Sequence, residues 1–387
     1  MSRFVFVSDS YPVAEGHGGG VVSYYELRAL QRHSNIVEAY TRPLNEQLLI
    51  DAVYPGNPYI FDHYVAAMIA DGGDIEISKL YGAGLPVTMK LLRAMGSKVI
   101  PTVPAHHLKI SVEEQIALHE DASCYGRGVK FGPPQPHVTN DHLFRISMKG
   151  VTDYATTVVC PSSTCVAFLK EYFGDPPTKG EVVIIPHGCD LPTEIANETT
   201  RGEFFTVLHV GQIGGDKGDK YLQQAWASIH PNLKNARLFF MGNNANAFGA
   251  GFEATGLGTP GRLNVSCFSG PAATKEAKET AYRGASCYVQ PSVTEGWGIP
   301  VLESMSHAVP VIVTDRTGAV DAVTDGKDGF IIPIRDPTAI SNSIQYFYDN
   351  PSEINRMGKN AREKALNYSW DKIENKYADL IKRAMED

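Results

Sequence analysis

Two glutamates eight positions apart, Glu295 and Glu303, occur in the segment EGWGIPVLE. The segment follows an apolar run that indicates a strand, and Pro300 suits the first turn of a helix because its missing N–H is not needed there. Gly296 and Gly298 leave the backbone N–H groups of this helix start unobstructed, and such a start attracts anions. The pattern favours a diphosphate site whose two carboxylates face different parts of one elongated ligand. The alternative is a buried strand–helix unit with incidental acids.

A second candidate anion site lies in the segment HVGQIGGDKGDK, residues 209–220. An apolar run leads into a glycine-rich turn, and Lys217 and Gly218 come directly before a stretch with helical periodicity. A diphosphate leaving group gains charge as its bond breaks, so its site needs a cation. We expect Lys217 to supply that cation. A surface lysine in an ordinary turn is the alternative.

A third glycine-rich segment, residues 18–20, follows the apolar run at residues 4–7 and opens a predicted helix. Glycines at such a junction let the backbone approach a phosphate or a sugar closely. Their spacing is not the G-x-G-x-x-G of dinucleotide-binding proteins, which argues against a Rossmann dinucleotide site. Tyr24, on the same predicted helix, is a candidate to stack on an acceptor sugar.

Two histidines, His106 and His107, follow the predicted strand at residues 98–103. A histidine at the carboxyl end of a strand can bond a sugar hydroxyl or orient an acceptor. Other histidines have irregular spacings, no D-x-D triplet occurs, and the six cysteines form no C-x-x-C pair. We therefore expect no metal site and no bound cofactor.

The composition restricts the class of protein. Of 387 residues, 43% are apolar, and 35 basic residues against 43 acidic ones give a formal net charge of −8. This balance offers no global attraction to nucleic acid or anionic lipid. No apolar run reaches the roughly 20 residues that a membrane-spanning helix needs, and the first residues lack a signal-peptide core. We expect a soluble, cytoplasmic protein.

Short apolar runs alternate with amphipathic stretches, as in parallel sheets covered by helices. The predicted strands are residues 4–7, 98–103, 156–160, 181–185, 204–210, 236–241, 265–268, 287–290 and 310–314. The predicted helices are residues 21–33, 219–229, 275–283, 300–307, 352–364 and 370–385. The fold class is therefore α/β, with two Rossmann-like, doubly wound domains facing across a cleft. We place them at residues 1–192 and 203–367, joined by a polar linker, and expect residues 110–150 to form loops.

The segment EGWGIPVLE resembles the E-x7-E signature of retaining GT-B glycosyltransferases of family 4, the glycogen synthase and sucrose synthase type. In such enzymes the first glutamate contacts the donor sugar and the second contacts the ribose, roles that fall here on Glu295 and Glu303. Residues 211–218 resemble the family's G-R-L-x-x-x-K-G, in which Arg and Lys both hold the diphosphate. Lys217 matches that Lys, whereas Gln212 stands where the Arg is usual and removes one bidentate donor.

The resemblance implies further roles. The donor-binding residues would be Gly19, Gly20, Gln212, Gly296, Trp297, Gly298, Ile299, Pro300 and Glu303. Glu295, Lys217 and His106 would be catalytic, and His107 and Tyr24 would lie on the acceptor side. A final helix, residues 368–387, would pack back on the first domain.

The expected activity is retaining transfer of a sugar from a UDP- or GDP-sugar to a hydroxyl of a carbohydrate, a lipid-linked glycan or another acceptor. Two alternatives remain: a nucleotide-sugar 2-epimerase of the same fold, and a degenerate ligand-binding relative, which Gln212 motivates. Residues 124–150 carry four basic residues against one acidic residue, 4 − 1 = +3. We favour a solvated loop there over a site for a nucleic-acid acceptor.

Overall fold

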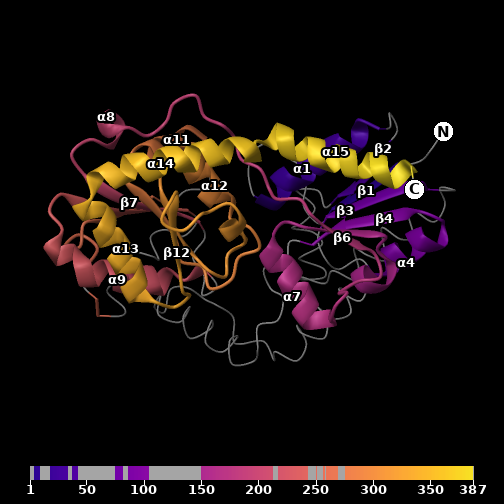
Figure 1. The fold of residues 1–387 in the computed structure, drawn as a ribbon, viewed down its shortest axis with the longest axis horizontal. Coiled ribbons are helices and arrows are strands. Elements are labelled where there is room, and N and C mark those ends of the chain that lie inside the picture. The colour runs from indigo at the N-terminus through magenta and orange to yellow at the C-terminus, as the bar shows by residue number, and fades with distance from the viewer. Residues whose placement is uncertain are drawn as a thin grey trace. The chain divides into compact units, whose positions relative to one another are not determined.

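The computed structural model of the chain describes residues 4–8, 18–33, 37–41, 75–81, 86–103, 150–211, 217–242, 250, 256–257, 259–268 and 275–386. These residues form two compact units (Figure 1). The N-terminal unit comprises the described residues up to 103, residues 150–188 and residues 370–386. The C-terminal unit comprises the described residues within 189–369. The predicted linker, residues 193–202, lies in the C-terminal unit and contains the short helix α8 (Glu198–Arg201).

The N-terminal unit is built on a parallel sheet with the strand order β2-β1-β3-β4-β5-β6. The strands are β1 (Phe4–Ser8), β2 (Val37–Thr41), β3 (Ile77–Tyr81), β4 (Lys98–Thr102), β5 (Thr157–Cys160) and β6 (Glu181–Ile184). The helices are α1 (Gly18–Gln31), α4 (Pro86–Ala94), α7 (Ser163–Phe173) and α15 (Trp370–Glu386). All five residues of β1 are buried, as expected of a parallel strand covered on both faces.

Helix α15, from the far end of the chain, packs along α1 (Figure 1). The ring of Trp370 stacks on Tyr25, with centroids 4.5 Å apart. The same two helices are also joined by charges. Arg28 lies 3.2 Å from the buried carboxylate of Glu374, and Arg32 contacts the same carboxylate. Aromatic stacking and charge pairing together attach the last helix to the N-terminal unit.

Strand β3 is a strand that the sequence pattern does not predict, because Lys79 interrupts its apolar residues. The structure explains this lysine. Lys79 and Glu26 are both fully buried, and the ammonium lies 3.1 Å from the carboxylate. Thr102 joins them, since Lys79 donates to its hydroxyl at 2.7 Å and that hydroxyl donates to Glu26 at 2.5 Å. Burial lowers the pKa of Lys79, although Glu26 opposes that effect.

The C-terminal unit has a second parallel sheet, with the order β12-β11-β10-β7-β8-β9. Its strands are β7 (Phe205–Val210), β8 (Ala236–Met241), β9 (Val265–Phe268), β10 (Cys287–Gln290), β11 (Val311–Thr314) and β12 (Gly329–Ile332). Its longer helices are α9 (Asp219–Ile229), α11 (Lys275–Arg283), α12 (Ile299–Ser306), α13 (Pro337–Asp349) and α14 (Pro351–Ala365). In chain order this is the 3-2-1-4-5-6 arrangement of Rossmann sheets, and its order reverses between β7 and β10.

Most predicted elements of this unit agree with the structure within one or two residues. Helix α9 and strands β8, β9 and β10 have the predicted bounds. Strand β12 and helix α13 are not among the elements predicted from the sequence. The predicted loop at residues 110–150 lies outside the described residues, except for residue 150, which is helical.

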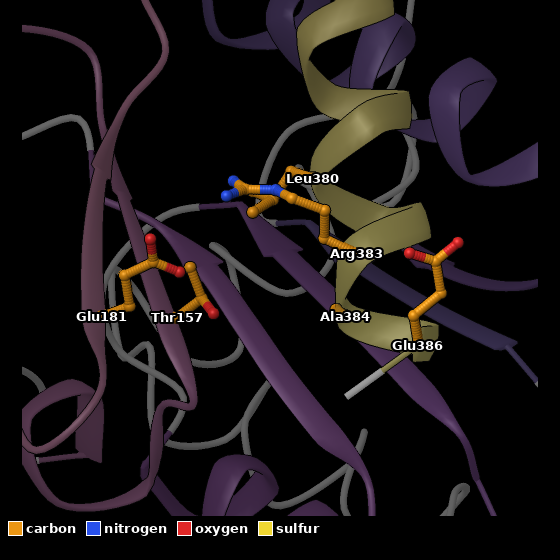
Figure 2. Close-up of a pocket in the computed structure, with 6 residues that line it drawn as sticks. All are labelled: Thr157, Glu181, Leu380, Arg383, Ala384 and Glu386. Atoms are coloured by element: carbon orange, nitrogen blue, oxygen red, sulfur yellow. The ribbon is translucent and has the colours of Figure 1, made fainter.

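A pocket of about 220 Å³ lies at the amino ends of β5 and β6 in the N-terminal unit (Figure 2). It is lined by Thr157, Glu181, Leu380, Arg383, Ala384 and Glu386. None of these is a site residue predicted from the sequence. Across the described ranges, no helix is long and apolar enough to span a bilayer.

Candidate active site

The candidate site lies where the sheet order of the C-terminal unit reverses. Strand β7 ends at Val210 and its neighbour β10 ends at Gln290, so the loops after them leave the same edge of the sheet. Ligands of open parallel sheets bind at such a point, because the two loops diverge and leave space between them. Lys217 follows the first strand and Glu295 follows the second.

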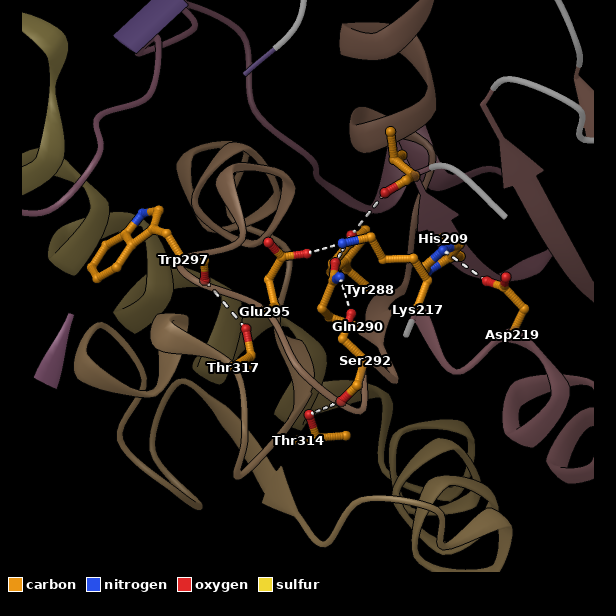
Figure 3. A network of polar contacts seen from close by, with 11 residues as sticks. His209, Lys217, Asp219, Tyr288, Gln290, Ser292, Glu295, Trp297, Thr314 and Thr317 are labelled. Carbon is orange, nitrogen blue, oxygen red and sulfur yellow. Dashed lines mark hydrogen bonds and ion pairs between the residues drawn. The ribbon is translucent and has the colours of Figure 1, made fainter. Parts of the chain in front are cut away.

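Lys217 and Glu295 form an ion pair at 2.7 Å (Figure 3). Their side chains are 21% and 19% exposed, so the pair is reachable from solvent yet screened less than a surface pair. The structure thus brings together two residues that the sequence motifs predicted separately. The pair places a cation and a carboxylate side by side at the edge of the sheet.

Close backbone packing sets the position of Lys217. Gly218 has φ +70° and is the N-cap of α9. A Cβ atom on Gly218 would lie 1.9 Å from the carbonyl oxygen of Pro291. The turn after β7 therefore rests directly on the backbone after β10, and this contact requires glycine.

The loop that carries Glu295 is held on both sides. Gly318 donates its N–H to the Glu295 carbonyl at 2.9 Å, and the Glu295 N–H donates to the carbonyl of Arg316 at 3.3 Å. Beneath the loop runs a buried chain of side-chain hydrogen bonds (Figure 3). Tyr288 donates to Gln290 at 2.6 Å, and Gln290 donates to Ser292 at 2.7 Å. These bonds fix the backbone from which Glu295 projects.

Helix α12 begins at Ile299, with Pro300 as its second residue, as the sequence predicted within one residue. Its N-cap, Gly298, has φ +100° and no side chain to cap the first turn. Gly296 and Gly298 are buried, whereas Ile299 and Pro300 are half-buried. This geometry retains the uncapped helix start at which we expect an anion.

Trp297, one of the predicted donor-binding residues, has a buried side chain. Its side chain is 2% exposed and its ring packs 5.8 Å from that of Tyr368. Its carbonyl accepts a hydrogen bond from Thr317 at 3.2 Å. The indole thus belongs to the core of the unit.

Glu303, one turn into α12, meets two residues that the sequence motifs do not mark. Lys278 contacts one carboxylate oxygen at 2.8 Å, and the Tyr282 hydroxyl donates to the other at 2.7 Å. Both come from α11, four positions apart, so they share one face of that helix. The i,i+4 spacing is visible in the sequence, but nothing there connects it with Glu303.

His209, on strand β7 just before the loop that carries Lys217, is buried. Its Nδ1 is 2.8 Å from the carbonyl of Val289, and its Nε2 is 3.6 Å from a carboxylate oxygen of Asp219 (Figure 3). Burial lowers the pKa of His209 to about 4; the Val289 carbonyl opposes that effect and Lys217 adds to it. The ring is therefore neutral at pH 7, so its contact with Asp219 is polar rather than ionic.

The remaining predicted residues belong to other parts of the chain. His106, His107 and Gln212 lie outside the described residues. Gly19 and Gly20 form the first turn of α1, which begins at Gly18.

Tyr24 is half-buried on α1 of the N-terminal unit. Its ring meets Tyr25 edge-on, with centroids 5.1 Å apart, and Arg28 lies 5.6 Å from its centroid.

The arrangement in the C-terminal unit has a defined chemical capacity. The site combines two ammonium groups, Lys217 and Lys278, with two carboxylates and one glycine-lined helix start. A cation next to a helix start binds phosphate, and carboxylates accept hydrogen bonds from hydroxyl groups. In the described part of the chain, no group of three histidine, cysteine or acidic side chains is arranged to hold a metal ion.

Comparison with known proteins agrees with a site that binds phosphate and hydroxyl groups. Residues 192–364 match the family model described as Glycosyl transferases group 1. The chain is 27% identical over 187 residues to the capsular polysaccharide biosynthesis glycosyltransferase CapM of Staphylococcus aureus. That alignment covers 46% of this chain and 47% of CapM, so the match spans about half the length of this relative.

Two solved structures resemble the chain over nearly its whole length. Sucrose-phosphate synthase from Thermosynechococcus elongatus aligns over 99% of both chains, with a TM-score of 0.70 and 18% identity. HepE of Anabaena, in complex with UDP-glucose, aligns over 99% of this chain and 100% of its own, with a TM-score of 0.65 and 14% identity. At these identities the likeness shows the fold, which is the two parallel-sheet Rossmann-like units of GT-B glycosyltransferases. The family match and the relatives support a transferase enzyme.

Proposed function

We propose that this chain, which carries a group 1 glycosyl transferase domain at residues 192–364, transfers a sugar from a nucleotide-diphosphate-sugar to an acceptor hydroxyl with retention of configuration. The observation that carries the proposal is the Lys217–Glu295 pair at the reversal point of the sheet, 2.7 Å apart beside the start of α12. HepE, which shares the fold, was solved with UDP-glucose, and that agrees with a nucleotide-sugar donor here.

Each group has a distinct task in this proposal. Lys217 and the amides at the start of α12 bind the diphosphate and stabilise the charge that it gains on leaving. Glu295 accepts hydrogen bonds from hydroxyls of the transferred sugar, and Glu303 accepts them from the ribose. Because Lys217 contacts Glu295, a bound donor must share or replace that ion pair. This exchange turns the internal pair into one contact with phosphate and one with sugar.

The chemical step needs no protein nucleophile. The acceptor hydroxyl attacks the anomeric carbon on the face from which the diphosphate leaves. The bond from that carbon to the diphosphate oxygen breaks, the new glycosidic bond forms, and the departing phosphate oxygen takes the hydroxyl proton. In this proposal no metal ion or further cofactor takes part, since Lys217 and the helix start supply the positive potential.

The test is the release of nucleoside diphosphate and the fate of the sugar. UDP-glucose, UDP-N-acetylglucosamine, GDP-mannose and ADP-glucose are incubated with the chain, with and without a panel of sugar, glycolipid and duplex DNA acceptors. We expect release of the diphosphate to be accelerated by an acceptor, and the product to keep the anomeric configuration of the donor. Conversion of the donor to its epimer without acceptor, an inverted product, or binding with no turnover would each overturn the proposal.

A further inference from the structure

Both oxygens of the Glu303 carboxylate are held by side chains of α11. Lys278 lies 2.8 Å from one oxygen and the Tyr282 hydroxyl lies 2.7 Å from the other. Glu303 is 20% exposed and Lys278 is 30% exposed, so the cluster borders solvent on one side. These two contacts thus fix the plane of the carboxylate.

Tyr282 is the rigid member of this cluster. Its side chain is 1% exposed, and burial, with Glu303 adding to it, holds the pKa of its hydroxyl well above the usual range. The hydroxyl therefore stays protonated and donates to the carboxylate. The Tyr282 ring stacks on His307, with centroids 5.1 Å apart and planes 27° apart. His307 in turn lies 2.7 Å from the carbonyl of Glu303 through Nδ1, so ring and carboxylate are fixed to one turn of α12.

The remaining capacity of the carboxylate suits a particular ligand. An ionised carboxylate accepts about four hydrogen bonds, two on each oxygen. Tyr282 and Lys278 use one on each oxygen, which leaves one on each. Two acceptors side by side match the two adjacent hydroxyls of a ribose better than a single hydroxyl.

We propose that Tyr282 and Lys278 are positioning residues that orient Glu303 for a cis-diol, and that they give the site its preference for ribonucleotides over 2′-deoxyribonucleotides. This inference rests on the proposed function, because it takes the nucleotide of the donor as the ligand of Glu303. Helix α11, which carries both residues, then takes part in donor recognition. Neither residue touches the bond that breaks, so their effect falls on nucleotide affinity rather than on the chemical step.

The experiment compares the affinities of UDP, GDP and ADP with those of their 2′-deoxy counterparts by titration calorimetry. We expect the wild-type chain to bind its preferred ribonucleotide on the order of tenfold more tightly than the deoxy form, since one hydrogen bond to a charged group is lost. In Tyr282→Phe and Lys278→Met that ratio falls toward one, because ribonucleotide affinity drops and deoxyribonucleotide affinity changes little. Lys278→Arg restores most of the ratio. With saturating donor, kcat stays near the wild-type value.

A matched control is Tyr346→Phe. Tyr346 also donates its hydroxyl to a glutamate, Glu353, at 3.2 Å, but on an exposed surface of the same unit. Tyr346→Phe should leave the affinities for all ribo- and deoxyribonucleotides unchanged. Equal losses for ribo- and deoxyribonucleotides in both test variants would overturn the inference while leaving the proposed function intact. If the wild-type chain binds none of the nucleotides, the proposed function fails first. If Tyr282→Phe lowers thermal stability too far, half-buried Lys278 still decides the question.

Discussion

Lys217 and Glu295 form a 2.7 Å ion pair although 78 positions separate them in the chain. The sheet order explains the contact, because β7 and β10 are neighbours and their following loops leave the same edge. Gly218 then brings the first loop onto the second through its contact with Pro291. One partner of the Lys217 ammonium is therefore another residue of the proposed donor site.

Replacing Lys217 by Met should weaken binding of nucleoside diphosphates about ten- to hundredfold, the value of one or two hydrogen bonds to a charged group. Binding of the corresponding nucleoside, which lacks phosphate, should not change. Titrations of UDP or GDP against uridine or guanosine measure the difference. Lys327→Met is the control, because Lys327 is exposed and precedes β12 at the amino ends of the strands. Equal losses for nucleotide and nucleoside would show that Lys217 does not bind phosphate.

The two glutamates should separate turnover from affinity. Glu295→Ala should lower kcat about 10²- to 10³-fold, the usual effect of removing a group that positions the reacting atoms. Nucleotide affinity should stay the same or rise, since Lys217 loses its competing partner. Glu303→Ala should instead raise the Kd for the nucleotide about tenfold. Steady-state kinetics and titration of both variants decide this, and small equal effects from both would contradict the assigned roles.

The sequence predicted those parts of the site whose residues lie close together in the chain. Glu295, Glu303 and the start of α12 lie within one short segment. Its glycines, proline and acids together indicate the junction between a strand and a helix. The fold class was equally accessible, because apolar runs and amphipathic stretches alternate along most of the chain. Both Rossmann-like sheets confirm it.

Long-range relationships were not accessible. Nothing in the segment Lys275–Arg283 indicates that Lys278 and Tyr282 face Glu303, since that contact depends on how α11 packs beside α12. Strand β3 was missed because a lysine in its centre is compatible with burial only when Glu26 lies opposite. In both cases the deciding partner is far away in the chain and carries no motif.

In the buried Lys79–Glu26 pair, removing one partner should cost more stability than replacing both. Lys79→Met should destabilise the N-terminal unit by about 3–5 kcal/mol, because Glu26 keeps a buried charge without its cation. The double variant Lys79→Met/Glu26→Leu should recover most of that loss. Urea unfolding followed by circular dichroism measures both. A double variant less stable than Lys79→Met alone would mean that the pair contributes net stability.

The neutral state of His209 should make the C-terminal unit sensitive to acid. The pKa of His209 is about 4 in the folded chain because of burial, against about 6.5 when unfolded. As pH falls, the unfolded chain takes up the proton first, so this contribution is complete above pH 6.5 and is lost between pH 6.5 and 4. The loss amounts to about 3 kcal/mol.

The histidine can be tested by replacement with a side chain that does not titrate. His209→Gln should be less stable at pH 7 but should lose less stability between pH 6.5 and 4 than the wild-type chain. Burial also lowers the pKa of His307, which remains in both proteins and affects both curves alike. Thermal unfolding at half-unit pH steps gives the comparison. Parallel curves would mean that folding does not lower the pKa of His209.

Gly218 should be intolerant of a methyl group for a reason that distinguishes it from other glycines of the unit. Gly256 has a similar backbone, with φ +74° against +70°, but a Cβ there meets no atom of the described residues within 4 Å. Gly256→Ala should therefore cost only about 1–2 kcal/mol, the price of a left-handed alanine. In Gly218→Ala the new Cβ would lie 1.9 Å from the Pro291 carbonyl oxygen, so the two loops must move apart. Lys217 then leaves Glu295, and transferase activity should fall at least a hundredfold while Gly256→Ala stays active. Similar activities in the two variants would show that the proposed reaction does not depend on the close approach of these loops.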